Sequence, residues 1–544
     1  MQERKYKGPS TSKASMDGFV SSRRTIGASS QPYSPKLGAP APTFENLVRR
    51  GDGFHPINRN YRNLGQSPEM NEAEALLNEP IVLDDVEEKS KKKRQFSKHG
   101  SKRRRIVKRT ALTLLALVVA GGAFFAFRLY MLERHILRGG GRAPALAENV
   151  DINKLKGEGD GRINILLLGN GGPGHDGPDL TDTIMLVSID PVNHNTALLS
   201  IPRDLWVKIP GDGYQKINAA YVYGKQQSKS KDEKVKDQAG LALLDKTLEP
   251  ILGVPIHYHA VVDFAAFKQT VNALGGVSVN VPESLYDPTM AWENHGNPYL
   301  AIKGQQTFNG DKALLYARSR ETSSDFARGQ RQRSLIVAIK DKTFSLGTFS
   351  NPVKVSGLLS SLGNNVYTDF SLDDLTHLYK IMDKIPSSAI TSIDLVTPPH
   401  DLVTTGNMNG LSIVEPKAGL FDYDAINNYV RNALKDSYIA KENAQIAIYN
   451  ATNVSGMATK QSNYLKSYGY NVVTVGNAPT PTNPQKTQIV DLTKGVDKYT
   501  RHYLEGRYGV TSTTALPPSL GITPPAGTSF VIIVGEDVAT STQN

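Results

Sequence analysis

Short runs of apolar and β-branched residues, bounded by Gly, Pro, Asp and Asn, recur between residues 160 and 400 and predict β-strands. Amphipathic stretches with the 3.6-residue period of an α-helix alternate with these runs. The strands are expected at 163–168, 183–189, 196–201, 257–262 and 277–281, and the helices at 240–252, 264–274 and 331–346, with a loop and a helix start at 304–319. The mixture is typical of an α/β or α+β domain, and we predict an α/β/α-layered domain with a mixed central sheet at 159–400.

A second, smaller unit is predicted at 443–538. Its strand-like runs lie at 444–452, 471–476, 487–492 and 529–535, and its helical patterns lie at 457–468 and 496–508. This order of elements predicts a small α/β domain built from βαβ-like units. Residues 401–442, between the two units, are expected to form an extension of the first domain or a linker.

An uncharged apolar stretch lies at 111–127, and with the residues up to 132 it is long enough to cross a hydrocarbon core of about 30 Å as a helix. It begins too far along the chain for a cleaved signal peptide. We therefore predict one transmembrane helix at 110–132, followed by a polar, Gly-rich stalk at 133–158.

Charge is unevenly distributed around this stretch. Residues 1–110 contain 23 Lys and Arg against 12 Asp and Glu, so the whole formal net charge of +11 lies there. Twelve bases at 89–109 directly precede the apolar stretch. The positive-inside rule then predicts a single-pass protein of the cell membrane, with a cytoplasmic N-terminus and folded domains outside the cell. The tail 1–109 is expected to be disordered, with its basic run on anionic lipid headgroups rather than on nucleic acid.

Several kinds of site are excluded or disfavoured by the sequence. The chain contains no cysteine, which excludes a disulfide scaffold, a thiol nucleophile and any cysteine-ligated metal centre. The glycines of 169–174 fit the dinucleotide pattern G-x-G-x-x-G after a strand. That kind of site needs a helix directly afterwards, whereas the sequence continues through GHDGPDLTD into a second strand, so nucleotide binding is disfavoured.

The same loop is a candidate metal site. Asp176, Asp179 and Asp182 lie within seven residues, between two predicted strands. Carboxylates at strand ends suit Mg²⁺, which prefers oxygen ligands and completes its shell with waters and phosphates. Aspartates that only form turns or cap backbone amides would show the same spacing, so both interpretations stay open at this point.

Arginines favour an anion site. Arg203 follows the third strand, and Arg318 and Arg320 would share one face if their segment is extended. Further polar residues follow at the entrance of the last predicted helix: Asp325, Arg328, Arg331 and Gln332. Because the guanidinium fork matches phosphate bidentately, such a cluster favours a highly anionic ligand such as pyrophosphate. The alternative is a solvated helix face on which Arg and Asp pair with each other.

Four stretches resemble the LytR–CpsA–Psr family, and they occur in the order found in that family. They read TDTIMLVSIDP (181–191), LLSIPRDLWVKIPG (198–211), KINAAYVYG (216–224) and YARSRETSSDFARGQRQR (316–333). The resemblance covers about 160–400, and the unit at 443–538 resembles more weakly the small C-terminal domain that many members carry. It implies an Mg²⁺-dependent phosphotransferase that moves a glycopolymer from a polyprenyl-pyrophosphate carrier to peptidoglycan. The implied partners are the lipid-linked glycan, peptidoglycan and membrane lipid, and no nucleic acid.

Carried over by position, the resemblance places Asp182 in the metal site. It places four arginines on the pyrophosphate: Arg203, Arg318, Arg320 and Arg328. Asp325 is the candidate proton acceptor, and further substrate contacts are expected from Arg331, Gln332, Lys216 and Asn218. The chain departs from the family pattern at Leu180, where an arginine is usual, and at 169–177, where the Gly-rich sequence obscures the first aspartate. Asp176 is our substitute for that aspartate as a metal ligand.

Two other functions remain open. The same pocket with water as the acceptor would hydrolyse polyprenyl pyrophosphate. A non-catalytic wall-binding or regulatory membrane protein would not need the arginines to converge on one site.

Overall fold

The computed structural model describes residue 123 and residues 140–320, 325–345 and 365–540. The predicted tail at 1–109 lies outside the described residues, as does the predicted transmembrane helix at 110–132 except for Ala123, which is helical. Among the described residues, no helix is both long enough and apolar enough to cross a membrane.

A six-stranded sheet with the order β11-β6-β1-β2-β3-β12 forms the centre of the first domain. Its strands are β1 (Ile163–Asn170), β2 (Thr183–Asp190), β3 (Asn195–Ile201), β6 (Tyr258–Asp263), β11 (Val366–Thr368) and β12 (Ile390–Ile393). β1, β2 and β3 pair antiparallel in sequence, and β11 is antiparallel to β6. β6 runs parallel to β1, and β12 runs parallel to β3. The prediction of a mixed central sheet is therefore confirmed.

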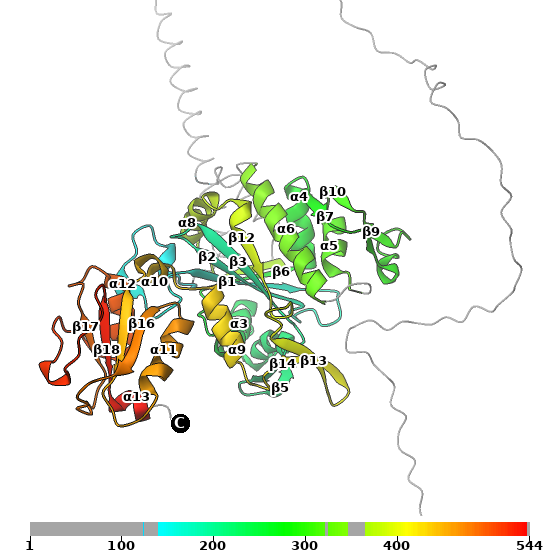
Figure 1. Cartoon of the computed structure of the whole chain (residues 1–544). Coiled ribbons are helices and arrows are strands. Elements are labelled where there is room, and N and C mark those ends of the chain that lie inside the picture. The colour runs from blue at the N-terminus through cyan, green and yellow to red at the C-terminus, as the bar shows by residue number, and fades with distance from the viewer. Residues whose placement is uncertain (1–122, 124–139, 321–324, 346–364, 541–544) are drawn as a thin grey trace, which may run out of the picture. The chain divides into compact units, whose positions relative to one another are not determined.

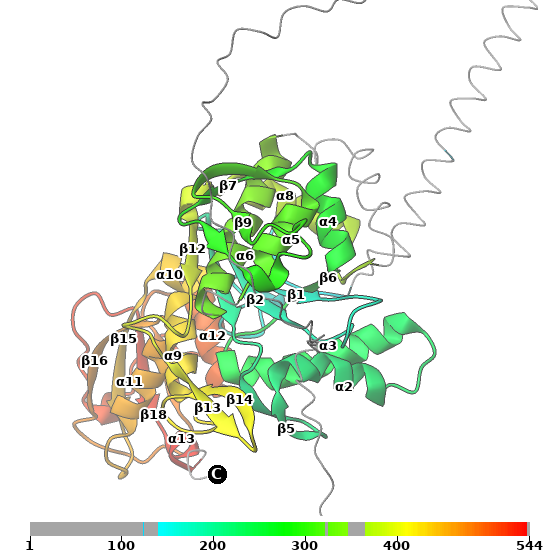
Figure 2. The same ribbon diagram turned by 90° about the vertical axis from the view of Figure 1, so that its right-hand side faces the viewer.

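Helices cover both faces of this sheet (Figures 1 and 2). Along β1 the side chains alternate: Leu166 and Leu168 are buried in one core, and Ile163 and Ile165 in another. The first core is completed by α2 (Ala220–Gln227), α3 (Glu233–Leu252) and α9 (Asp424–Ala433). The opposite side carries α4 (Phe264–Ala273), α5 (Gly310–Arg318), α6 (Asp325–Ser345) and α8 (Leu372–Asp383).

Two smaller pieces extend from the layers. The hairpin of β4 (Trp206–Ile209) and β5 (Gly213–Lys216) directly follows the end of β3. A lobe with its own core contains β7 (Val277–Val281), β8 (Leu285–Tyr286), β9 (Tyr299–Ala301) and β10 (Gly304–Phe308). β7 pairs with β10, and β8 pairs with β9.

Residues 401–434 pack on the first domain, whereas Tyr438 and Ile439, in the helix that follows, are buried in the core of the C-terminal domain. Residues 401–442 form the hairpin β13 (Val403–Met408) and β14 (Leu411–Pro416), then α9, then α10 (Ser437–Glu442). Ile426 and Val430 of α9 are buried in the same core as Leu166 and Leu168. This part of the chain therefore supplies one of the layers that cover the sheet.

The described part of the predicted stalk does not extend away from the domains, so that prediction is wrong for 140–158. Ala145 and Leu146 are buried beside Tyr258 and Phe370. Leu155 is buried in the core of the C-terminal domain. The few apolar residues within this polar stretch thus fasten it to both domains.

The C-terminal domain contains a four-stranded sheet with the order β16-β15-β18-β17. Its strands are β15 (Gln445–Asn450), β16 (Asn471–Asn477), β17 (Gln488–Asp491) and β18 (Phe530–Val534), and its helices are α11 (Met457–Ser467), α12 (Lys498–Tyr508) and α13 (Glu536–Thr540). β15 is parallel to β16 and β18, whereas β17 is antiparallel to β18. The strands and the two longer helices lie where the sequence predicts them.

Buried carboxylates join the two domains. The Asp436 carboxylate accepts hydrogen bonds from the amides of Gly159 (3.0 Å) and Gly161 (2.8 Å) and from the Tyr503 hydroxyl (3.1 Å). Nearby, Arg507 and Tyr470 both donate to Glu158 at 2.7 Å. A buried carboxylate needs several donors to offset its lost hydration. These bonds therefore fix how the two domains pack against each other.

A buried histidine joins three elements of the first domain. His259 on β6 lies 2.7 Å from Asp369 through Nδ1 and 2.9 Å from Asp245 of α3 through Nε2. Burial alone lowers the pKa of His259, but its hydrogen bonds and attraction to the two carboxylates outweigh this and raise it to about 9. The imidazolium therefore connects α3 and the turn before α8 to the sheet.

Replacing His259 with Gln should reveal this link as a pH-dependent loss of stability. Because the folded-state pKa exceeds the ordinary value near 6.5, the stabilisation is complete below pH 6.5 and disappears as the pH rises through about 9. The wild type should exceed the variant by about 3 kcal/mol in unfolding free energy at pH 6, and the gap should shrink steadily towards pH 10. Denaturant unfolding across this range measures it.

The matched control is His377→Gln, because His377 is a partly exposed histidine that lies 3.6 Å from Asp373 one helical turn away. It should change the stability by about 0.5 kcal/mol or less at every pH. A His259→Gln deficit that stays constant from pH 6 to pH 10 would show that the imidazole acts by packing alone.

Candidate active site

Polar residues gather at one edge of the central sheet because of the strand register. Gly169 at the end of β1 pairs with Thr183 at the start of β2, and Ile184 pairs with Ile201 at the end of β3. The loop after β1, the residue before β2 and the residues after β3 therefore meet at this edge.

Asp182 and Arg203 form an ion pair at this edge, through Arg203 Nη1 and Asp182 Oδ1. The Asp182 side chain is 41% exposed, whereas that of Arg203 is 12% exposed. Asp204 lies 3.6 Å from Arg203 Nε, and Lys216 Nζ lies 2.7 Å from Asp204. Three of the predicted positions (Asp182, Arg203 and Lys216), together with Asp204, thus form a row of alternating charge that is open to solvent at Asp182.

Asn218 holds the backbone beside this row. Its carbonyl accepts hydrogen bonds from the Thr181 amide at 3.3 Å and hydroxyl at 3.2 Å, and its own amide donates to the Arg203 carbonyl at 3.3 Å. These bonds fix the start of β2 against the end of β3, which positions the Asp182–Arg203 pair.

Arg318 and Arg320 lie at the end of α5. Arg318 is the last residue of the helix, so the extended segment that would place both arginines on one face is not formed. Arg318 donates to Glu293 of the β8–β9 lobe at 2.7 Å and lies 4.9 Å above the Phe264 ring. The Arg320 amide donates to Asp287 of the same lobe at 3.3 Å, and its side chain is partly exposed.

Arg331 is a structural residue rather than an open anion contact. Its guanidinium is buried and donates to the carbonyls of Tyr316 (2.9 Å) and Ser319 at the end of α5. Burial lowers the pKa of Arg331, against the opposing effects of Tyr316 and Asp287. The residue thereby holds α6 against the segment that carries Arg318 and Arg320.

The other residues predicted on α6 are placed as follows. Gln332 donates to the Thr183 hydroxyl at 3.0 Å and to the Ala317 carbonyl at 3.4 Å, so it joins the start of β2 to α5. Arg328 is buried. Asp325 is the first residue of α6, and its side chain lies outside the described residues.

The three aspartates of the loop have different environments. Asp179 forms an ion pair with Lys225 at 2.9 Å, so the structural interpretation of its spacing applies to it. Asp176 is exposed and forms no hydrogen bond or ion pair with a described residue. Of the three aspartates, Asp182 is the one that forms an ion pair with a predicted arginine, Arg203, among the described residues.

Asp263 was missed by the sequence interpretation. It ends β6, pairs in register with Asn170 of β1, and caps α4 by accepting from the Ala266 amide at 2.7 Å. Burial raises the pKa of Asp263. Gly172 of the loop approaches so closely that a Cβ there would lie 2.7 Å from Asp263 Oδ2, so glycine is required at this position. The sequence VVDF at the end of the strand could have indicated Asp263, because an aspartate between a strand and a helix commonly caps the helix.

The donor set fits a magnesium ion held mainly by its substrate. Among the described residues, no group of three or more His, Asp or Glu side chains is arranged to hold a metal. Magnesium commonly takes one or two protein carboxylates and completes its shell with waters and phosphates. The half-exposed carboxylate of Asp182, beside Arg203, meets that smaller requirement.

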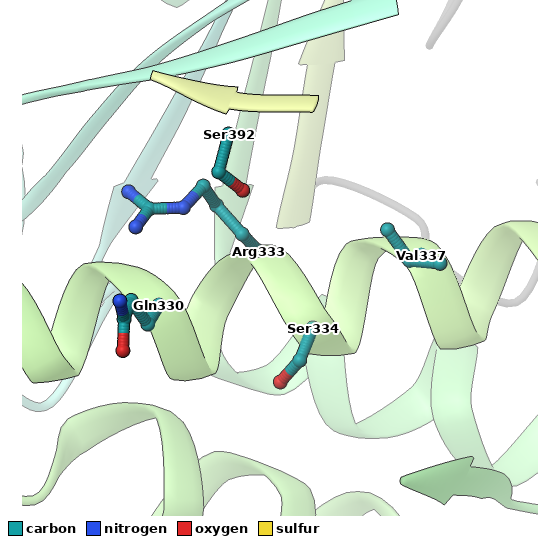
Figure 3. Close-up of a pocket in the computed structure, with 5 residues that line it drawn as sticks. All are labelled: Gln330, Arg333, Ser334, Val337 and Ser392. Carbon is teal, nitrogen blue, oxygen red and sulfur yellow. The ribbon is translucent and has the colours of Figure 1, made fainter. Parts of the chain in front are cut away.

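A cavity of about 260 Å³ lies between α6 and β12. Figure 3 shows its lining of Gln330, Arg333, Ser334, Val337 and Ser392, with the Arg333 guanidinium directed towards the sheet. Arg333 is buried and donates to the Ser200 hydroxyl at 2.9 Å. With Val337 as its one apolar side chain, this cavity does not suit a long prenyl chain.

Two family models match the chain. The LytR_cpsA_psr family model matches residues 140–419, and the model described as LytR cell envelope-related transcriptional attenuator matches residues 443–537. Both matches confirm the resemblances that the sequence motifs indicate.

The chain is also similar to named relatives and to a solved structure. The polyisoprenyl-teichoic acid–peptidoglycan teichoic acid transferase TagT of Bacillus subtilis is 30% identical over 322 residues, which is 58% of this chain and 90% of TagT. The transferase of the same type named TagU, from Oceanobacillus iheyensis, is 37% identical over 234 residues, 42% of this chain and 65% of TagU. A solved structure titled TagT bound to LIIa-WTA is 28% identical and covers 55% of this chain and 98% of its own, with a TM-score of 0.41.

The structural position of Arg331 predicts that Arg331→Gln lowers the free energy of unfolding by about 3 kcal/mol, because two buried carbonyls lose their donors. Arg318→Gln, which breaks a partly exposed ion pair, should cost about 1 kcal/mol or less. Denaturant unfolding of both variants measures the difference. Equal stability of the two would contradict the assignment of Arg331 to the α5–α6 junction.

Proposed function

The chain belongs to the LytR–CpsA–Psr family, and we propose that it is a membrane-anchored phosphotransferase that moves a glycopolymer from a polyprenyl-pyrophosphate carrier to peptidoglycan. The product linkage would be a phosphodiester, and the anchor would be the apolar stretch at 110–132. The observation that carries the proposal is the ion pair of Asp182 and Arg203 at the sheet edge, which is open to solvent at Asp182. The similarity to TagT, named as a teichoic acid transferase, supports it.

The proposed reaction is attack of a peptidoglycan hydroxyl on the phosphorus nearest the glycan. The new P–O bond forms as the bond to the polyprenyl phosphate breaks, and the hydroxyl proton passes to a base, for which Asp325 is our candidate. Arg203, Arg318 and Arg320 would bind the pyrophosphate oxygens on which negative charge increases. A magnesium ion held by Asp182 would neutralise part of that charge.

Before binding, the arginines have carboxylate partners that a phosphate can replace. Arg318 forms an ion pair with Glu293, and Arg203 forms one with Asp182. Both guanidinium groups are therefore held in place by partly exposed ion pairs. A pyrophosphate carries more charge than either carboxylate, and it can take over their hydrogen bonds. Such pairing keeps the side chains ordered, which lowers the entropic cost of binding.

The transfer should be tested with the full chain in lipid nanodiscs, a short polyprenyl-pyrophosphate glycan, Mg²⁺ and peptidoglycan oligomers. Mass spectrometry should detect a glycan-phosphate joined to peptidoglycan. Arg318→Ala should slow its formation by about 100-fold or more, as expected when a donor to the developing charge is removed.

Arg501→Ala is the matched control, because Arg501 is 39% exposed on α12 of the C-terminal domain. It should leave the rate unchanged. Release of free glycan phosphate without an adduct would indicate a hydrolase instead. Absence of turnover with active relatives run in parallel would favour a wall-binding or regulatory protein.

Magnesium dependence should be tested with two aspartates of the same loop. Asp182→Asn should raise the Mg²⁺ concentration needed for half-maximal transfer by about tenfold or more, since it removes a charged oxygen ligand. Asp176→Asn should act similarly only if Asp176 is the second ligand, as the sequence interpretation proposes. Mg²⁺ titrations of the transfer rate distinguish the two, and an unchanged requirement in Asp182→Asn would contradict the metal assignment.

A further inference from the structure

A second surface hollow lies along the β4–β5 hairpin. It has a volume of about 250 Å³ and is lined by residues of the hairpin, of α3 and of the segment before α9. Five of its side chains matter for binding: Lys208, Tyr214, Lys246, Phe421 and Tyr423. We call these five residues the hairpin groove.

Aromatic rings form one wall of the hairpin groove. Tyr214 is 50% exposed, and its ring centroid lies 4.8 Å from that of Phe421. The Phe421 backbone has a φ of 69°, in the left-handed region that bulky residues rarely adopt. An unfavourable backbone that keeps an aromatic ring at the surface is more typical of a binding site than of a loop without function.

Two positive charges flank these rings. Lys208 of β4 and Lys246 of α3 are both exposed, and neither forms an ion pair with any residue in the described part of the chain. The Asp422 carboxylate, next in sequence to Phe421, accepts a hydrogen bond from the Asp424 amide. The groove thus combines flat apolar faces with two ammonium groups that lack a counterion.

The hairpin connects this groove to the candidate active site. Trp206 pairs with Lys216, and Lys208 pairs with Tyr214, so the two cross-strand pairs lie on the same face of the hairpin. They are separated by two residues of strand, about 7 Å. Lys216 binds Asp204, which is next to Arg203, so this face of the hairpin leads from the candidate active site towards the groove.

From this geometry we propose that the hairpin groove binds a phosphate-bearing glycan, with sugar rings on Tyr214 and Phe421 and phosphates on Lys208 and Lys246. The assignment rests on the proposed function only in identifying that glycan as the polymer being transferred. Apolar faces with a few charged groups are the usual composition of such sites. The groove would bind the sugar units that follow the reacting end of the polymer.

The test is binding of pentamannose 6-phosphate, a soluble phosphorylated oligosaccharide, to the full chain in phosphatidylcholine nanodiscs by calorimetry. Dephosphorylated pentamannose is the neutral probe. We expect the phosphorylated probe to bind at least tenfold more tightly. The variant K208S/K246S should abolish that preference, and Tyr214→Ala should weaken both probes by about tenfold.

Controls separate this proposal from the transferase proposal. K303S/K460S removes two exposed lysines elsewhere and should bind as the wild type does. Arg318→Ala should also retain binding, because Arg318 does not line the groove. If K208S/K246S binds the phosphorylated probe like the wild type, or if only Arg318→Ala loses it, the groove proposal is wrong while the transferase proposal is untouched. Absence of any binding by the wild type would likewise overturn it, independently of the transfer assay.

Discussion

The antiparallel register of β1, β2 and β3 fixes the position of the candidate site, because it brings the end of β1, the start of β2 and the end of β3 to one edge. Gly169 opposite Thr183 and Ile184 opposite Ile201 define that register. A shift by one residue would turn Ile184 and Leu186 out of the core, so apolar burial resists it. Asp182 and Arg203 therefore meet through constraints that are set in the core rather than at the surface.

The polar residues of the candidate site fall into two groups, those that stabilise the fold and those that a ligand can reach. Arg331, Gln332 and Asn218 use their hydrogen bonds on the backbone or on other structural residues. Asp182 and Arg203 use theirs on each other, at a place open to solvent. A ligand that brings both a cation and an anion can replace such a pair without leaving either charge alone, which is the combination offered by a magnesium pyrophosphate.

The sequence predicted the strands and helices well where the apolar period was strong, as in 163–168 and 264–274. The family motifs also assigned Asp182 and Arg203 to the same site. It could not separate Arg331 from Arg318, because burial against carbonyls depends on how α5 meets α6. Asp263 was hidden for a similar reason, since its closeness to the Gly-rich loop follows from the parallel pairing of β6 with β1. Distant partners such as His259 and Asp369 leave no local pattern at all.

The shared carboxylate of Asp436 has a consequence for how such proteins can diversify. Its donors include the amides of Gly159 and Gly161, just before the first strand of the first domain, and the hydroxyl of Tyr503 in the C-terminal domain. A C-terminal domain transferred by gene recombination to a different first domain would bring Tyr503 without Asp436, Gly159 and Gly161. The two domains are thus inherited most safely as one unit, and substitutions at 158–161 are tied to those at 436 and 503.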